Sequence, residues 1–272
     1  MTDPPPRGWS WKVADPAANA ELGLLYEPGT WGDLLKAAWA VPLARRVAVD
    51  GPPTLLDPFA GAASYPLVPA AAERLRSAPS LGIEDLLDDF LRRGRLPSTG
   101  ALALAAAGEG ARLVVYDVHT ARRATWRGLP GVTVAEELRS GEELLAARAS
   151  EADLVLVDPY DLFERFEALL PAALSAQAPL LLYLYNKAPR GPKALARYRA
   201  FRERLTALAG KRCVRVGRAP SDALLPRAYH EVLLVAPPPL ARALDPVLGD
   251  VTRRLAAAVA EAGAYEAPGE TT

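Results

Sequence analysis

Short apolar segments alternate with longer amphipathic segments along most of the chain. Almost entirely apolar runs, the pattern of strands buried on both faces, span residues 54–57, 112–117, 132–134, 152–158, 179–185, 212–216 and 231–236. Apolar residues recur at helical spacing in residues 31–43, 142–149, 193–208 and 240–262. Thr30 precedes the first of these helices and is predicted to cap it.

This alternation predicts an α/β domain built on a mostly parallel sheet with helices on both faces. The last two predicted strands have no convincing crossover helix between them, so we expect an antiparallel strand at one edge. That arrangement favours the class I methyltransferase variant of the Rossmann-type sheet over the dehydrogenase variant. We expect an irregular N-terminal arm over residues 1–20, one domain over 21–265, and a small helical insertion over about 66–108.

Composition narrows the classes of function. The 272 residues include 32 basic and 32 acidic side chains, so any binding of nucleic acid would need a local basic patch. Cys213 is the only cysteine, which excludes an intrachain disulfide framework and fits a reducing, cytoplasmic setting. With only His119 and His230 besides, we expect no metal site, and we expect neither a membrane helix nor a signal peptide.

Three of the predicted strands end in an acid, at Asp57, Asp117 and Asp158. Ligands of open α/β sheets bind beyond the carboxyl ends of the strands, where these side chains would lie. After the first strand the chain has a small-residue turn, Ala60-Gly61-Ala62, in place of the Gly-x-Gly-x-x-Gly of dinucleotide enzymes, and it has no phosphate loop. The pattern favours S-adenosylmethionine, with Asp117 on the ribose hydroxyls; each acid taken singly could instead cap a helix or solvate a loop.

Asp158-Pro159-Tyr160 is the sharpest local motif. An exocyclic base amine is a poor nucleophile because its lone pair is delocalised into the ring, and a carboxylate that accepts its hydrogens favours rehybridisation of the nitrogen. The tyrosine could stack on a base rotated out of its strand. The alternative is an ordinary strand-to-loop turn with a packed tyrosine.

Several segments, taken in order, are similar to motifs of one family over roughly residues 22–260. They are Tyr26, Gly29 and residues 33–36, then 57–63, 97–100, 117–119, 158–160 and 233–238. In this order they resemble the bacterial large-subunit ribosomal RNA adenine-N6 methyltransferases of the RlmJ type. The resemblance implies S-adenosylmethionine as cofactor and an adenine in rRNA as the acceptor.

The chain departs from that family at several positions. Ala37 and Phe59 stand where the family has histidines, and Ser140-Gly141 stands where it has Asp-Gly. One proline is missing from its Asp-Pro-Pro-Tyr motif, so Tyr160 takes the place of the second proline or the loop is shorter. Asp-Pro-aromatic motifs also occur in guanine-N2 methyltransferases, so the target amine stays open.

The strand-end acids, the local motifs and the family resemblance together define the predicted site. The candidate catalytic residues are Asp158, Pro159 and Tyr160. The candidate cofactor-binding residues are Lys36, Asp57, Phe59, Ala60, Gly61, Thr99, Asp117, Ser140 and Gly141. Lys187 and Arg190, near Lys193, are candidate contacts for the RNA, and Arg122, Arg123 and Arg127 form a second basic run that could equally be a solvated face.

The sequence therefore predicts an S-adenosylmethionine-dependent methyltransferase acting on a base amine in RNA, with adenine N6 of rRNA favoured. Two alternatives stay open. One is a degenerate member that binds through the same pocket without catalysis, which the lost histidines favour. The other is a methyltransferase for a small molecule or a protein, which the neutral net charge favours. The oligomeric state is open.

Overall fold

The computed structural model describes residues 22, 28–159, 162–186, 192–220 and 229–262. The predicted arm over residues 1–20 lies outside these ranges, as do Tyr26, Tyr160, Lys187 and Arg190.

One large sheet organises the molecule, and its strand order is β5-β4-β1-β6-β7-β9-β8. Its strands are β1 (Thr54–Asp57), β4 (Arg112–Val115), β5 (Val132–Val134), β6 (Leu154–Val157), β7 (Leu180–Asn186), β8 (Cys213–Pro220) and β9 (Tyr229–Ala236). Within this sheet only β9 runs opposite to the other strands: it is antiparallel to β7 on one side and to the edge strand β8 on the other. The predicted fold class is confirmed, since this order with a reversed strand next to the edge is that of class I methyltransferases.

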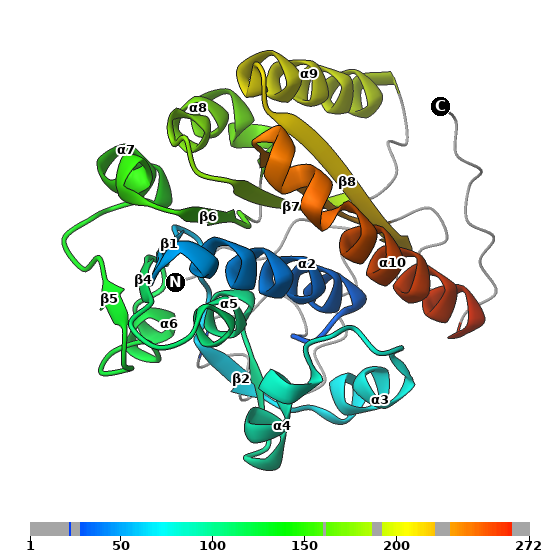
Figure 1. The fold of residues 1–272 in the computed structure, drawn as a ribbon. Helices are drawn as coiled ribbons and strands as arrows, with labels where there is room; N and C mark the ends of the chain where they lie inside the picture. Colours follow the sequence, from blue (N-terminus) through cyan, green and yellow to red (C-terminus); the bar gives the residue numbers. More distant parts are fainter. Residues whose placement is uncertain (1–21, 23–27, 160–161, 187–191, 221–228, 263–272) are drawn as a thin grey trace.

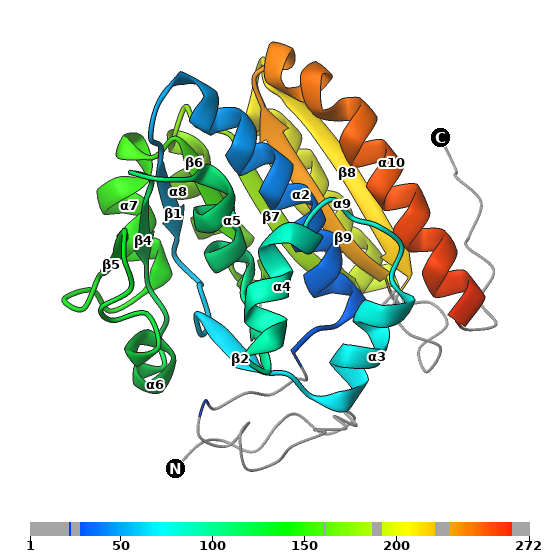
Figure 2. The same ribbon diagram turned by 60° about the horizontal axis from the view of Figure 1, so that its bottom comes forward.

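Helices cover both faces of the sheet, as Figures 1 and 2 show. One face carries α2 (Trp31–Val47), α5 (Thr99–Ala107) and α10 (Pro238–Ala262). The other carries α7 (Gly141–Arg148), α8 (Leu162–Ser175) and α9 (Pro192–Ala209). Two separate apolar clusters result, one on each side of strands that are buried on both faces, which explains why those strands read as continuous apolar runs.

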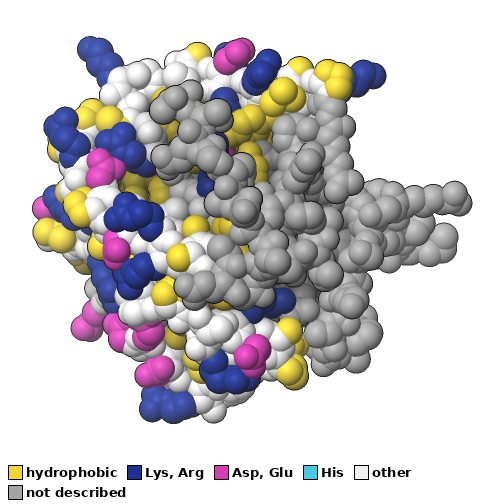
Figure 3. Space-filling view, turned by 90° about the vertical axis from the view of Figure 1, so that its right-hand side faces the viewer, with side chains coloured by type: hydrophobic (Ala, Val, Ile, Leu, Met, Phe, Trp, Pro, Cys, Tyr) yellow, Lys and Arg dark blue, Asp and Glu magenta, His cyan; other side chains and the backbone are white. Residues whose placement is uncertain are grey.

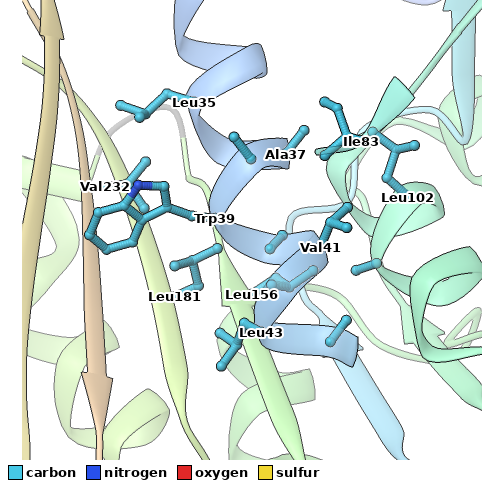
Figure 4. Close-up of a cluster of buried hydrophobic side chains, with 14 of the residues drawn as sticks. Leu35, Ala37, Trp39, Val41, Leu43, Ile83, Leu102, Leu156, Leu181 and Val232 are labelled. Atoms are coloured by element: carbon cyan, nitrogen blue, oxygen red, sulfur yellow. The ribbon is translucent and has the colours of Figure 1, made fainter. Parts of the chain in front are cut away.

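Helix α2 begins where the sequence predicts. The Thr30 side chain accepts a hydrogen bond from the Asp33 N–H, and the Asp33 carboxylate accepts from the Thr30 N–H, so the two residues form a capping box. The helix is buried almost all round. In the close-up of Figure 4, Trp39 lies beside Val232 of the sheet and Ala37 lies on the side of Ile83 and Leu102.

The range predicted as a helical insertion contains α3 (Pro69–Ser77) and α4 (Glu84–Arg92). In the sequence these two helices lie between β2 (Ser64–Pro66) and β3 (Arg95–Pro97), which pair as a separate two-stranded antiparallel sheet. The chain then enters α5, which packs on α2 and leads to β4. The short helix α6 (Thr120–Ala124) follows β4. Within the described ranges, no helix combines the length and apolar character needed to cross a membrane.

Candidate cofactor and acceptor site

The carboxyl ends of three adjacent strands bring Asp57, Asp117 and Asp158 to one edge of the sheet. β1 lies between β4 and β6, so the chain crosses to opposite sides of β1, and ligands of open α/β sheets bind at such a switch point. Asp57 interacts electrostatically with both of the other acids. Asp57 and Asp117 are buried, and the Asp158 side chain is 34% exposed. The arrangement gathers three carboxylates where a ligand would enter.

Gly61 anchors the turn that follows β1. Its N–H donates to Asp117 Oδ2 at 3.1 Å, and its carbonyl accepts from the indole N–H of buried Trp126 at 2.9 Å. Gly61 has φ +63°, a left-handed conformation that other residues rarely adopt. The turn is therefore fixed from two sides before any ligand binds.

The two amides after Gly61 are also occupied. The Ala62 N–H donates to the Tyr65 hydroxyl at 3.1 Å, and the Ala63 N–H donates to Thr125 Oγ1 at 2.8 Å. Neither acceptor was predicted from the sequence: Tyr65 lies on β2, three residues beyond Ala62, and Thr125 follows α6, far along the chain.

Asp117 is held as an acceptor at the end of β4. Oδ1 accepts from the His119 N–H at 2.7 Å, and Arg122 Nη1 lies 3.5 Å from Oδ2. Next to it, Val118 is 77% exposed, a large apolar side chain presented to solvent. The Nδ1 atom of His119 is buried and has no hydrogen-bond partner. Asp117 thus lies beside an exposed apolar side chain and an unpaired polar atom, and its own oxygens retain lone pairs. This combination fits a ribose and its base.

Asp57 is the buried acid at the end of β1. Its Oδ1 accepts from the Phe59 N–H at 3.3 Å, and a Cβ placed on Gly100 would lie 2.7 Å from Oδ2. Gly100 and Thr99 open α5, and Ser98 caps that helix by accepting from the Ala101 N–H. Burial, with the nearby negative charge of Asp158, raises the pKa of Asp57 to about 7.

Lys36 joins α2 to the end of β6. Its ammonium lies 2.5 Å from Asp158 Oδ2, 2.9 Å from Asp33 Oδ1 and 4.4 Å from the centre of the Tyr183 ring. Burial raises the pKa of Asp158, against the opposing effect of Lys36. For Asp33 burial acts in the same direction, but the charge and hydrogen bond of Lys36 together with the hydrogen bonds from Thr30 outweigh it, and the pKa lies below the usual value. The lysine is thus shared between two carboxylates at the carboxyl end of β6.

Tyr183 and His230 extend this group across the sheet. The Tyr183 hydroxyl lies 2.7 Å from His230 Nδ1, and a Cβ on Gly32 would come within 2.4 Å of both atoms. Burial lowers the pKa of His230 to about 4, so the imidazole is neutral near pH 7. The sequence analysis missed Asp33, Tyr183 and His230 as neighbours of Lys36, although Gly32 inside the apolar helix is a signal of close approach.

The remaining predicted cofactor residues have mainly packing contacts. Ser140 caps α7 by accepting from the Glu143 N–H at 3.2 Å. Gly141 lies against the turn after β1, and a Cβ there would come within 2.4 Å of the Pro58 carbonyl and 2.5 Å of the Phe59 ring. Ala60 is buried in the core. The Ser140-Gly141 pair is therefore placed beside the first turn, without an acidic side chain.

The basic residues are divided between described and undescribed segments. Arg122 donates to the Leu22 carbonyl at 2.8 Å, and Arg123 and Arg127 both pair with Glu136. Lys193 is exposed at the start of α9. Figure 3 shows Lys and Arg side chains interspersed with Asp and Glu over the coloured part of one face. Contact of either run with RNA stays a prediction.

Pro159 is buried directly after Asp158.

Over the part of the chain that the structure covers, no cluster of three His, Cys, Asp or Glu side chains is arranged to hold a metal ion.

Comparison with solved structures agrees with the fold. The protein LPL1258 of Legionella pneumophila, described as a DUF519 protein, aligns with a TM-score of 0.65 at 16% identity over 85% of this chain and 94% of that one. At that identity the likeness shows the fold alone.

Weaker likenesses include human methyltransferase-like protein 13 in complex with SAH (TM-score 0.38, 12% identity, 87% of this chain and 93% of that one). Another is M. jannaschii TYW2 in complex with AdoMet (TM-score 0.37, 9% identity, 78% and 77%). Neither is close enough to argue from. No protein-family model matches the chain, and no curated protein matches it in sequence.

Proposed function

We propose that the protein is an S-adenosylmethionine-dependent methyltransferase whose acceptor is an exocyclic amine of a nucleobase in RNA, with adenine N6 of rRNA as the favoured target. The observation that carries the proposal is the pairing of two sites on one sheet edge. Asp117 and Gly61 form a preorganised diol-binding corner at β4 and β1. The Lys36–Asp158 pair stands at the end of β6, on the other side of β1.

The described residues fit the cofactor. The carboxylate of Asp117 is positioned by two backbone N–H groups and retains acceptor capacity for the ribose hydroxyls. Val118 offers an apolar face for the adenine ring, and the unpaired Nδ1 of His119 lies in the same loop. When bound, S-adenosylmethionine would supply an electrophilic methyl group.

The protein itself would align the reactants and accept first a hydrogen bond and then a proton from the amine. Asp158 would accept a hydrogen bond from the base amine, which concentrates the nitrogen lone pair, and would then take the proton that the nitrogen loses. Burial raises the pKa of that carboxylate, and the nearby charge and hydrogen bond of Lys36 oppose the rise and favour its ionised form. Holding the amine against a fixed carboxylate replaces an encounter in solution by a near-attack geometry.

The choice of a base amine rests on Asp158-Pro159-Tyr160 and on the resemblance to the RlmJ-type enzymes. A binding protein without catalysis is the second candidate. It is favoured by Ala37 and Phe59, which replace histidines of that family, and by Ser140, which caps α7 where the family has an acid.

Transfer of a labelled methyl group distinguishes the methyltransferase from the binding protein without catalysis. Wild-type protein is incubated with labelled cofactor and pools of rRNA, tRNA and DNA, beside Asp158→Asn and the surface control Asp250→Asn. We expect label in rRNA with the wild type and the control, and a loss of at least 100-fold in rate with Asp158→Asn. Cofactor binding by calorimetry without label in any pool would support the binding protein instead.

The cofactor site is tested separately by calorimetry with S-adenosylhomocysteine. One site per chain is expected. Asp117→Asn keeps the shape of the side chain but removes its charge, so binding should weaken by about 1.5–3 kcal/mol. Absence of binding at millimolar ligand would contradict the proposed function altogether.

A further inference from the structure

Tyr65 lies against the turn after β1 although it belongs to the small sheet of the insertion. Its ring is 7% exposed and packs with Leu22 and Ala62. Its hydroxyl oxygen lies beside Gly61, since a Cβ placed on that glycine would come within 2.3 Å of it. Gly61 therefore has the Asp117 carboxylate at its N–H and the Tyr65 hydroxyl where a side chain would otherwise be.

The hydrogen bonds of this hydroxyl are incomplete. The oxygen accepts from the Ala62 N–H at 3.1 Å, and its own hydrogen has no acceptor among the described residues. Thr125 offers a direct comparison: Oγ1 accepts from the Ala63 N–H at 2.8 Å, but its hydrogen is donated to the Arg122 carbonyl at 2.7 Å. Of the two hydroxyls that hold this turn, only that of Tyr65 has a donor left over, and a buried polar hydrogen normally has a partner.

The surroundings favour an anion as that partner. The N–H groups of Ala62 and Ala63 are already used, so an anion lying on this turn cannot take them. Asp33, Lys36 and Arg122 are all near enough to Tyr65 to act on its pKa, so the hydroxyl has two cations and one carboxylate in its surroundings. Burial nevertheless raises the pKa of Tyr65 to about 12, so the hydroxyl keeps its proton at neutral pH.

We propose that the Tyr65 hydroxyl donates a hydrogen bond to the carboxylate of the cofactor's methionine moiety. This rests on the proposed function, which places the ribose at Asp117. Asp117 and Tyr65 lie at two sides of Gly61, so Asp117 would hold the ribose hydroxyls and Tyr65 would hold the amino-acid end of the same ligand. The contact makes Tyr65 a residue that selects ligands bearing the carboxylate.

The test compares S-adenosylmethionine with its decarboxylated form, which lacks only that carboxylate, by calorimetry on the full chain. The wild type should bind the complete cofactor at least about tenfold more tightly. Tyr65→Phe removes the donor and keeps the ring, so affinity for the complete cofactor should fall about 10- to 100-fold, while affinity for the decarboxylated form should change little. The preference between the two ligands then shrinks by the same factor.

Thr125→Val is the matched control, because it removes a hydroxyl from the same turn whose hydrogen is already used. Any effect it has should be equal for the two ligands and leave the preference unchanged. An equal loss for both ligands in Tyr65→Phe, or no preference in the wild type, overturns the role of Tyr65 but leaves the proposed function standing. Failure of the wild type to bind either ligand overturns the proposed function, and the role of Tyr65 with it.

Discussion

The ammonium of Lys36 lies 2.5 Å from the carboxylate of Asp158, a residue 122 positions further along the chain. The lysine side chain is 10% exposed and the aspartate 34%. A charge this deeply placed needs its partners, because removing one leaves the other charge poorly solvated. The contact ties the first long helix to the central strand β6 at the point where the acceptor is proposed to bind.

Lys36→Met should therefore destabilise the fold. It leaves the carboxylates of Asp158 and Asp33 without their shared cation, and we expect unfolding in urea to become easier by about 2–3 kcal/mol. Adding Asp158→Asn removes one of the two charges and should restore about 1 kcal/mol. Arg45→Met, on the same helix, breaks an exposed ion pair with Asp85 of α4 and should change stability by less than about 1 kcal/mol. A double variant no more stable than Lys36→Met alone would show that the two residues are not coupled.

Asp57→Asn should stabilise the protein at neutral and alkaline pH. In the folded protein the pKa of Asp57 is raised to about 7, chiefly by burial, whereas the unfolded chain ionises near the usual value. Stability due to this group is complete at low pH and is lost as pH rises through about 7. The variant keeps the acceptor for the Phe59 N–H but does not ionise. Its advantage in urea should be close to zero below pH 4 and about 2–4 kcal/mol at pH 8; an advantage independent of pH contradicts the assignment.

Titration of His230 should make the folded protein less stable as the pH falls, whereas titration of Asp57 makes it less stable as the pH rises. Burial lowers its pKa to about 4, so the folded state favours the neutral ring. The stability that it contributes is present above about pH 6.5 and is lost as pH falls through 4. His230→Gln can still hydrogen-bond Tyr183 and does not titrate, so its melting temperature should fall less than that of the wild type between pH 7 and pH 4. Tyr183→Phe keeps the buried histidine and should show the wild-type dependence on pH.

Gly141→Ala should disturb the turn after β1. The new Cβ would come within 2.4 Å of the Pro58 carbonyl and 2.5 Å of the Phe59 ring, and backbone cannot move aside as a flexible side chain can. We expect a loss of about 1–3 kcal/mol in stability and weaker binding of S-adenosylhomocysteine. Gly249→Ala in α10 meets only the end of the Arg253 side chain at 3.3 Å, and should leave stability unchanged or raise it by up to about 1 kcal/mol. Equal behaviour of the two variants would argue against a close approach at Gly141.

The apolar pattern along the chain is enough to predict the sheet and the edge where the acids lie. Segments such as 152–158 are apolar throughout because the strand is buried on both faces, and that local pattern identifies a central strand without any knowledge of its neighbours. Thr30 caps its helix through a contact three residues away, which is also a local signal. Once the strands are parallel, Asp57, Asp117 and Asp158 must lie at one edge.

Which side chains meet at that edge depends on how the folded elements pack together. The contacts of Lys36 with Asp158, Thr125 with Ala63, and Tyr183 with His230 join distant parts of the chain, and their partners depend on strand order and on how each helix packs. Periodicity indicates which face of an element is buried, but it carries no information about what covers that face. The preorganised turn and the shared lysine therefore follow from packing between distant segments, which no local pattern encodes.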